Sequence, residues 1–200
     1  MTTLTDMILK LLSRVCCFLF RWKVARTEHD IPRPCVVVAT PHTSNWDFLV
    51  LIATTRLNDV EMSWLGKRQM FDGPLGPLFR ALGGIPVDRA APGGIVAELV
   101  ERLTDDPDLV VVVPAEGTRA ATEYWKSGFY RIAQQAGIPI QTAYVDGRNR
   151  TSGFGPHLHA SGDVSADMDL LREFYADKTG IRADRFLTPQ LREEASEKAA

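Results

Sequence analysis

The chain has 200 residues, of which 45% are hydrophobic and 24% are charged. This length predicts a single domain, since separate cores usually appear only beyond about 250 residues, and the composition excludes a disordered, collagen-like or coiled-coil protein. The formal net charge of -2 provides no overall positive field, so nucleic acid is not an expected partner and any anion site must be local.

The cysteines of the chain are Cys16, Cys17 and Cys35. An adjacent pair does not readily bridge to itself, and no C-x-x-C pattern occurs, so the sequence predicts neither a disulfide framework nor a zinc site. A reducing, cytoplasmic compartment fits this cysteine usage best.

Residues Met7 to Trp22 form the most apolar stretch of the chain. As a helix, this stretch would be about 24 Å long, which is shorter than the hydrocarbon layer of about 30 Å that a spanning helix must cross. At 100° per residue, one side of the helix is polar and cationic, with Lys10, Ser13, Arg14, Cys17 and Arg21. The opposite side is apolar, with Ile8, Leu11, Leu12, Val15, Leu19 and Trp22. This pattern is typical of a helix that lies in the interface of an anionic membrane.

Two other interpretations of this helix stay open: it packs on its own domain, or it is a signal peptide. Arg14 within the apolar stretch and the lack of a small-residue cleavage site before Arg21 argue against a signal peptide. We therefore expect a membrane-interface helix at residues 1–24, one domain at residues 25–190 and a frayed tail at residues 191–200. This organisation predicts a cytoplasmic protein, peripheral or monotopic at the inner face of the membrane.

From residue 35 onward, short apolar runs alternate with helical patterns, which predicts an α/β fold with a mostly parallel or mixed sheet flanked by helices. The predicted strands are Cys35 to Thr40, Glu61 to Gly66, Gly84 to Val87, Leu109 to Val113 and Pro139 to Val145. The predicted helices are Asn45 to Leu57, Gly73 to Leu82, Gly94 to Leu103, Glu123 to Ala136 and Val164 to Lys178. After the last strand, Gly153 to Pro156 is predicted as a turn.

The first chemical constellation follows the apolar strand that begins at Cys35. His42 falls in the loop after this strand and Asp47 in the first turn of the next helix, which is where α/β proteins place their chemistry. A carboxylate five residues on can fold back to fix the tautomer of the imidazole, and such a histidine can take a proton from a hydroxyl. The alternative is that Asp47, with Ser44, only caps the helix. Ser44 as a nucleophile lacks the G-x-S-x-G elbow.

A second constellation gathers cations at the ends of three predicted strands. Gly117, Thr118 and Arg119 follow one strand, Lys67 and Arg68 follow another, and Arg89 follows a third. Glycine permits close backbone approach, a threonine hydroxyl donates, and the guanidinium fork of arginine matches phosphate oxygens. Because these strand ends meet at one edge of a parallel sheet, we expect a local site for a phosphate or another anion.

Other candidates are weaker. His157 and His159 place two imidazoles two residues apart, but no further histidine or cysteine lies near them, so no metal site is predicted. Trp46 and Phe48 flank Asp47 and belong either to the core or to an acyl channel.

Taken together, these segments resemble the glycerolipid acyltransferase family typified by 1-acylglycerol-3-phosphate O-acyltransferase, over roughly residues 35 to 145. The family has four blocks in fixed order, which here are His42-Thr43-Ser44-Asn45-Trp46-Asp47, Gly83-Gly84-Ile85-Pro86-Val87-Asp88-Arg89, Pro114-Ala115-Glu116-Gly117-Thr118-Arg119 and Gly137-Ile138-Pro139-Ile140. Ala115 stands where the third block usually runs proline directly into glutamate.

The resemblance implies that His42 is the general base and Asp47 its orienting partner. It also implies that Glu116, Gly117, Thr118 and Arg119, with Arg89 and with Lys67 or Arg68, bind the polar head of the acceptor. The acyl donor would be acyl-CoA or acyl carrier protein, which acts as a co-substrate, and no cofactor or metal is expected. Backbone amides of the His42 to Trp46 turn or of the Gly117 loop are candidates to stabilise the oxyanion.

The expected activity is therefore transfer of a fatty acyl group to a lysophosphatidic-acid-like acceptor in phospholipid biosynthesis, on an anionic membrane surface. One alternative is an acyltransferase for another lysolipid or for a glycolipid. A second is a membrane lipid-binding module without catalysis. A third is a thioester hydrolase that uses Ser44.

Overall fold

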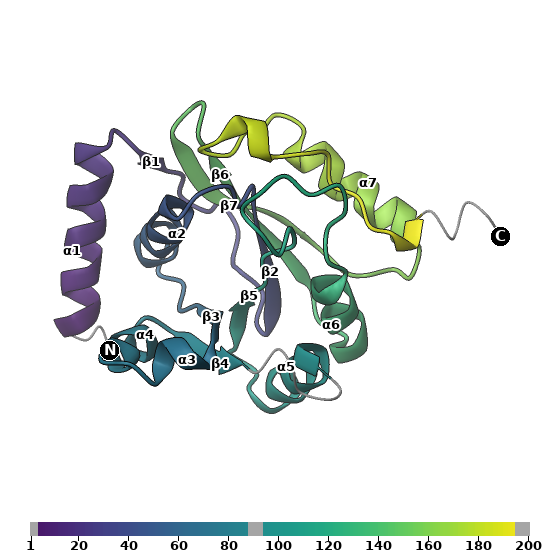
Figure 1. Ribbon diagram of the computed structural model, residues 1–200, viewed down its shortest axis with the longest axis horizontal. Helices are drawn as coiled ribbons and strands as arrows, with labels where there is room; N and C mark the ends of the chain where they lie inside the picture. Colours follow the sequence, from purple (N-terminus) through teal and green to yellow (C-terminus); the bar gives the residue numbers. More distant parts are fainter. Residues whose placement is uncertain (1–3, 88–93, 195–200) are drawn as a thin grey trace.

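The structure, a computed structural model, describes residues 4–87 and 94–194. Within these residues, seven strands form one sheet in the order β1-β7-β6-β2-β5-β3-β4 (Figure 1). Their bounds are β1 Lys23–Val24, β2 Cys35–Thr40, β3 Ser63–Lys67, β4 Gly84–Val87, β5 Val110–Val112, β6 Ile140–Asp146 and β7 Thr151–Leu158.

Strands β2 to β6 run parallel to one another, whereas β7 pairs antiparallel with β6, and β1 pairs parallel with β7. The prediction of a mixed, mostly parallel sheet is confirmed. The parallel part brings the carboxyl ends of β2, β3, β5 and β6 to one edge, where the loops with the predicted chemistry begin.

Helices cover both faces of the sheet (Figure 1). Side chains of α5, α6 and α7 pack with Val36 and Val38 of β2 in one buried cluster, and side chains of α2 and α3 pack with Cys35 and Val37 in another. Successive residues of a strand point to opposite faces, so the uninterrupted apolar run of β2 is what a strand between two helical layers requires. The helices are α1 Leu4–Leu19, α2 Trp46–Leu57, α3 Arg68–Phe71, α4 Gly76–Ala81, α5 Gly94–Asp105, α6 Gly128–Ala136, α7 Val164–Tyr175 and the 3₁₀ helix η1 Ala183–Arg185.

The predicted turn at Gly153 to Pro156 is wrong, because these residues lie inside β7. The backbone groups of this stretch pair with β6, and a register shift between Gln141 and Ala143 accommodates them. A β-carbon at Gly155 would lie 2.2 Å from the ring of Phe174, so this glycine marks close packing of α7 on the strand rather than a turn.

Helix α6 begins at Gly128, five residues later than the predicted start at Glu123. The amide of Trp125 donates to the carbonyl of Gln190 at 2.9 Å, and the amide of Lys126 donates to Ala115 at 2.7 Å. These tertiary hydrogen bonds hold the preceding residues in an extended path.

The chain after α7 forms a packed C-terminal segment, residues 176–194, which runs back beside α7 (Figure 1, yellow). Leu191 and Glu194 are buried, and Glu194 accepts a hydrogen bond from Arg172 at 2.8 Å. The expected frayed tail at residues 191–200 is therefore wrong for residues 191–194, and the rest of that tail lies outside the described residues.

Helix α1 packs outside the core, beside α2 (Figure 1). Its polar side faces the domain: Lys10 contacts Asp6 and Asp59, Asp6 contacts Arg56 at 3.3 Å, and Ser13 is buried. Its apolar side faces outward, with exposed Met7, Ile8, Leu11, Leu12, Val15, Phe18 and Leu19. In the described part of the chain, no helix combines the length and the apolar character that crossing a bilayer requires.

Candidate active site

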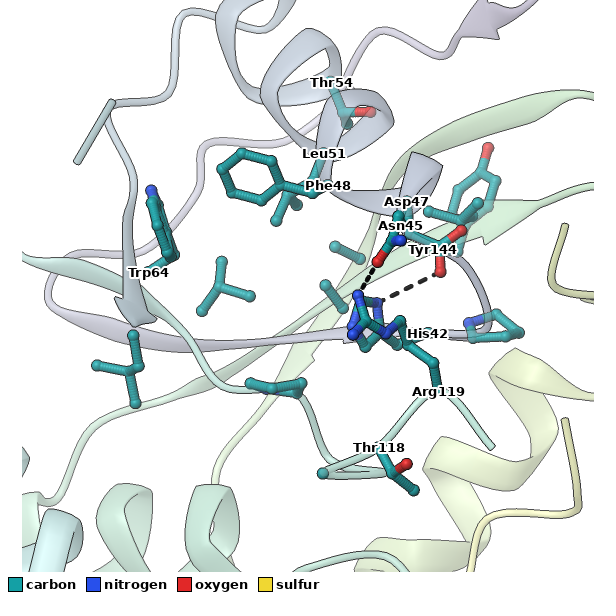
Figure 2. Close-up of a pocket in the computed structure, with 18 of the residues that line it drawn as sticks. His42, Asn45, Asp47, Phe48, Leu51, Thr54, Trp64, Thr118, Arg119 and Tyr144 are labelled. Atoms are coloured by element: carbon teal, nitrogen blue, oxygen red, sulfur yellow. Dashed lines mark hydrogen bonds and ion pairs between the residues drawn. The ribbon is translucent and has the colours of Figure 1, made fainter. Parts of the chain in front are cut away.

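His42 and Asp47 lie together at the carboxyl end of β2. The imidazole Nδ1 is 3.3 Å from Oδ2 of Asp47 (Figure 2). The His42 side chain is 29% exposed, whereas that of Asp47 is 4% exposed. A buried carboxylate beside Nδ1 favours the tautomer in which the proton sits on that nitrogen, and this leaves Nε2 as a base.

The same carboxylate also holds the turn that precedes helix α2. Oδ2 of Asp47 accepts from the amides of Thr43 at 2.6 Å and Ser44 at 2.7 Å. One oxygen of Asp47 therefore contacts both the imidazole and the turn, and within the described residues the N-cap residue of α2, Asn45, makes no side-chain capping hydrogen bond. Ser44 is buried, and its hydroxyl accepts from the amide of Trp46 at 3.2 Å, which places it in the turn and not on the cavity wall.

Glu116 approaches the same loop from β5. Its Oε1 accepts a hydrogen bond from the hydroxyl of Thr40 and another from the amide of His42 at 2.8 Å. Burial raises the pKa of this carboxyl above its ordinary value, against the opposing effect of these two donors. The Glu116 side chain faces the His42 loop and does not line the cavity, so its contacts differ from those of a head-group ligand.

The cations expected at the sheet edge have separate placements. Arg119 hydrogen-bonds to Oδ1 of Asn45, within the His42 to Asp47 turn, and lies beside His42 (Figure 2). Gly117, Thr118 and Lys67 line the same cavity, whereas Arg68, the first residue of α3, is exposed and does not line it. Arg89 lies outside the described residues.

The cavity has a volume of about 660 Å³, within the range of small-molecule sites. Its polar part holds His42, Asn45, Thr118 and Arg119. An apolar part extends from there toward Trp64 (Figure 2), with Ala39, Phe48, Leu51, Leu65, Phe79, Val112 and Ala143. Phe48 packs edge-on against Trp64, with ring centroids 4.9 Å apart, and both side chains line the apolar part of the cavity. Trp46 is instead mostly exposed and contacts Phe20 at the end of α1.

Most amides predicted to stabilise an oxyanion already have acceptors. The amide of His42 donates to Glu116, those of Thr43 and Ser44 donate to Asp47, and that of Gly117 donates to Pro114 at 3.2 Å. These groups are part of the loop structure and are not free to meet a substrate.

Tyr144 and Arg185 are among the cavity residues that sequence reasoning missed. Tyr144 comes from β6, and Arg185 comes from η1 in the C-terminal segment. No local pattern marks either residue, because only the tertiary path of the chain brings them to the cavity. Within residues 4–87 and 94–194, no three His, Cys, Asp or Glu side chains are grouped in a way that holds a metal ion.

Comparison with solved structures finds the same fold in the 1-acyl-sn-glycerophosphate (LPA) acyltransferase PlsC from Thermotoga maritima. The match covers 78% of this chain and 70% of that chain, with a TM-score of 0.56 and 15% sequence identity. No curated protein sequence gives a significant match. A model of the acyltransferase family matches residues 23–146, which is more than half of the chain. The chain therefore belongs to the acyltransferase family.

Proposed function

We propose that this acyltransferase moves a fatty acyl group from a thioester, acyl-CoA or acyl carrier protein, to the hydroxyl of a lysophosphatidic-acid-like acceptor at a membrane surface. The observation that carries the proposal is the imidazole of His42, braced by a buried carboxylate, at the wall of a cavity that is cationic at one end and apolar at the other. Fatty acyl transfer to a phosphorylated alcohol needs both ends.

In this mechanism, Nε2 of His42 takes the proton of the acceptor hydroxyl as its oxygen attacks the thioester carbonyl. Asp47 stabilises the imidazolium that forms. The tetrahedral oxyanion then collapses: the new C–O bond remains, the C–S bond breaks, and the imidazolium returns its proton to the leaving thiolate. The products are an ester and a thiol, and no covalent enzyme intermediate is needed.

We assign the oxyanion donor to the side-chain amide of Asn45. Arg119 occupies its Oδ1, so its Nδ2 is the part of the group left to donate, and Asn45 lines the cavity beside His42. One well-placed oxyanion donor typically contributes about 10²- to 10³-fold in rate.

Arg119 would anchor the phosphate of the acceptor. Its guanidinium fork suits phosphate oxygens, and its position beside His42 would hold the acceptor hydroxyl near the base. For Arg119→Ala we expect a KM for the phosphorylated acceptor that rises at least about tenfold, with a smaller change in KM for the acyl donor. Steady-state kinetics with each substrate varied in turn measures this. An unchanged KM for the acceptor would show that Arg119 does not bind its phosphate.

The outward apolar side of α1 supports action at a membrane. A helix that served only to complete the core would bury this side. Phe18 is instead 82% exposed, and the polar side packs on α2, where Asp6 pairs with Arg56. Arg14 and Arg21 stay exposed beside it and suit anionic lipid head groups.

The deciding experiment is a thiol-release assay with palmitoyl-CoA and lysophosphatidic acid, with the product identified by mass spectrometry. We expect thiol release that requires the acceptor, and His42→Ala should lower kcat at least about 10³-fold with the Tm unchanged. His157→Ala, an exposed histidine of β7 remote from this cavity, is the matched control and should keep wild-type turnover.

Each competing function gives a different result in this assay. Lipid binding without thiol release from any donor and acceptor would indicate a binding module. Free fatty acid that forms without acceptor and depends on Ser44 would indicate a hydrolase. If His42→Ala kept the turnover of the wild type, His42 could not be the general base.

A further inference from the structure

The C-terminal segment brings an additional cation, Arg185, to the cavity wall. This residue lies 39 positions beyond the end of the acyltransferase family match at residue 146 and outside all four sequence blocks. Nothing in the blocks or in the family match therefore assigns it a role.

The segment is fastened to the loop that carries His42. The amide of Arg182 donates to the hydroxyl of Thr43, the residue after His42, at 3.1 Å. Gly180 lies so close to Thr43 that a β-carbon on the glycine would be 2.5 Å from the threonine side chain. These two contacts set the position of η1 relative to the base.

A second attachment lies at the end of β6. The amide of Gly147 donates to the carbonyl of Thr179 at 2.6 Å, and the hydroxyl of Thr179 donates to Asp146 at 3.1 Å. The backbone that leads to η1 is therefore held both at the loop after β2 and at the end of β6. These contacts fix the position of the turn that carries Arg185.

The electrostatic setting of Arg185 favours an anion. Of the described residues that line the cavity, three are cationic, Lys67, Arg119 and Arg185, and one is a carboxylate, Asp47, which His42 and two amides already engage. Arg119 is hydrogen-bonded to Asn45, whereas the guanidinium of Arg185 makes no hydrogen bond or ion pair with any described residue. A half-buried guanidinium facing a cavity with five free donors is best satisfied by an oxyanion.

We infer that Arg185 binds a phosphate group of a substrate in this cavity. The inference rests on the proposed acyl transfer, whose substrates carry phosphate in two places: the head group of the acceptor, and the phosphopantetheine or nucleotide part of the donor. A planar guanidinium on a fixed turn gives a bidentate contact that lysine does not reproduce.

The test compares Arg185→Gln with Arg182→Gln. Both variants remove one arginine charge from the same short turn, but the side chain of Arg182 is exposed and does not line the cavity, and the substitution keeps its backbone contact with Thr43. We expect Arg185→Gln to raise KM about tenfold for the phosphate-bearing substrate, with kcat changed less than about threefold, and Arg182→Gln to match the wild type. Arg185→Lys should recover only part of the loss.

Two arms of the kinetics distinguish the source of the phosphate. A rise in KM for lysophosphatidic acid but not for monoacylglycerol assigns the phosphate to the acceptor. A rise in KM for acyl-CoA but not for acyl-pantetheine, which lacks the phosphates, assigns it to the donor. Kinetics of Arg185→Gln equal to those of Arg182→Gln with every substrate would overturn the inference, as would an equal loss of turnover with phosphorylated and unphosphorylated substrates.

Failure of the proposed function gives a separate signature, because the wild type would then release no thiol with any pair. In that case, calorimetric titration with glycerol 3-phosphate tests whether Arg185 binds a phosphate group. Weaker binding to Arg185→Gln than to Arg182→Gln supports the subsite, and equal or absent binding to all three proteins overturns it.

Discussion

Two buried carboxylates contact His42 at different atoms. Asp47 faces the imidazole and two amides of the turn, and Glu116 accepts from the backbone amide of His42 itself. Among the described residues, one oxygen of each carboxylate, Oδ1 of Asp47 and Oε2 of Glu116, has no hydrogen-bond partner. Burying a partly satisfied carboxylate is costly, so we interpret both as groups that stability alone would not select.

Variants of Glu116 separate a positioning role from head-group binding. Glutamine keeps an oxygen that can accept from Thr40 and from the amide of His42, whereas alanine does not. We expect Glu116→Gln to keep kcat within about tenfold and Glu116→Ala to lower kcat by about 10²-fold through displacement of His42, with little change in acceptor KM for either. A large rise in acceptor KM for both variants, with kcat retained, would show that Glu116 binds the head group.

The pH dependence of stability gives an independent test of the raised pKa of Glu116. Because burial raises the pKa of the folded carboxyl, the folded protein holds a proton between the ordinary and the raised pKa that the unfolded chain has released. The stability of the wild type should therefore fall as the pH rises through this window, and Glu116→Gln should lack that component. Thermal unfolding of both proteins from pH 4 to 8 checks the sign of this effect. The Tm of the variant, relative to that of the wild type, should increase as the pH rises.

At the level of elements, the C-terminal segment couples the fold to the cavity. Asp146 at the end of β6 accepts from the hydroxyl of Thr179 and from the side chain of Asn149 at 2.6 Å, and so ties the segment to the sheet. Burial alone would raise the pKa of Asp146, but these hydrogen bonds lower it overall. Its stabilising contribution is then present above the ordinary pKa and is lost as the pH falls through the lowered value.

We expect Asp146→Ala to lower the free energy of unfolding by about 2 kcal/mol or more at pH 7, a fall in Tm of about 4–8 °C for a chain of this size. The variant should also raise the KM of the phosphate-bearing substrate, because Arg185 loses its fixed position. Calorimetry and steady-state kinetics measure the two effects. As a control, Asp163→Ala removes the N-cap of α7, which should cost stability and leave KM unchanged. If Asp146→Ala loses the expected stability but keeps the KM of the wild type, the C-terminal segment does not contribute to substrate binding.

At the level of the whole molecule, α1 adds an apolar surface outside a core that is already complete. Among the described residues, the two buried clusters of the sheet include none of α1. The ring of Phe20, just after α1, lies 5.8 Å from that of Trp46, in the first turn of α2 that follows His42. A lipid surface that covered α1 would therefore lie next to the cavity that we assign to acyl transfer.

Replacing Phe18 and Leu19 with serine should weaken binding to vesicles of anionic phospholipid, because each large apolar side chain contributes about 1.5–3 kcal/mol when it leaves water. Leu170→Ser on α7 is the matched control, since Leu170 is also exposed but lies on a different helix. Vesicle sedimentation at several salt concentrations measures the effect. Equal sedimentation of the double variant and the wild type would count against α1 as the membrane contact.

The sequence by itself determined the family and most of the elements. The strand Cys35–Thr40 was predicted with its observed bounds, because a fully apolar run between turn residues has few alternatives. His42 and Asp47 are five residues apart across a strand-to-helix junction, so local geometry alone brings them together. The four blocks were sufficient to predict the acyltransferase family.

Only the tertiary structure decided the features that depend on distant partners. Strand β7 exists because β6 supplies its hydrogen bonds, although Gly153, Gly155 and Pro156 are residues that otherwise favour turns. The role of Glu116 depends on which loop lies above it, and Arg185 reaches the cavity only because the C-terminal segment folds back over Thr43. Local propensity extends over a few residues, whereas the contacts of Glu116 with His42 and of Arg182 with Thr43 join positions 74 and 139 residues apart, so packing selected them.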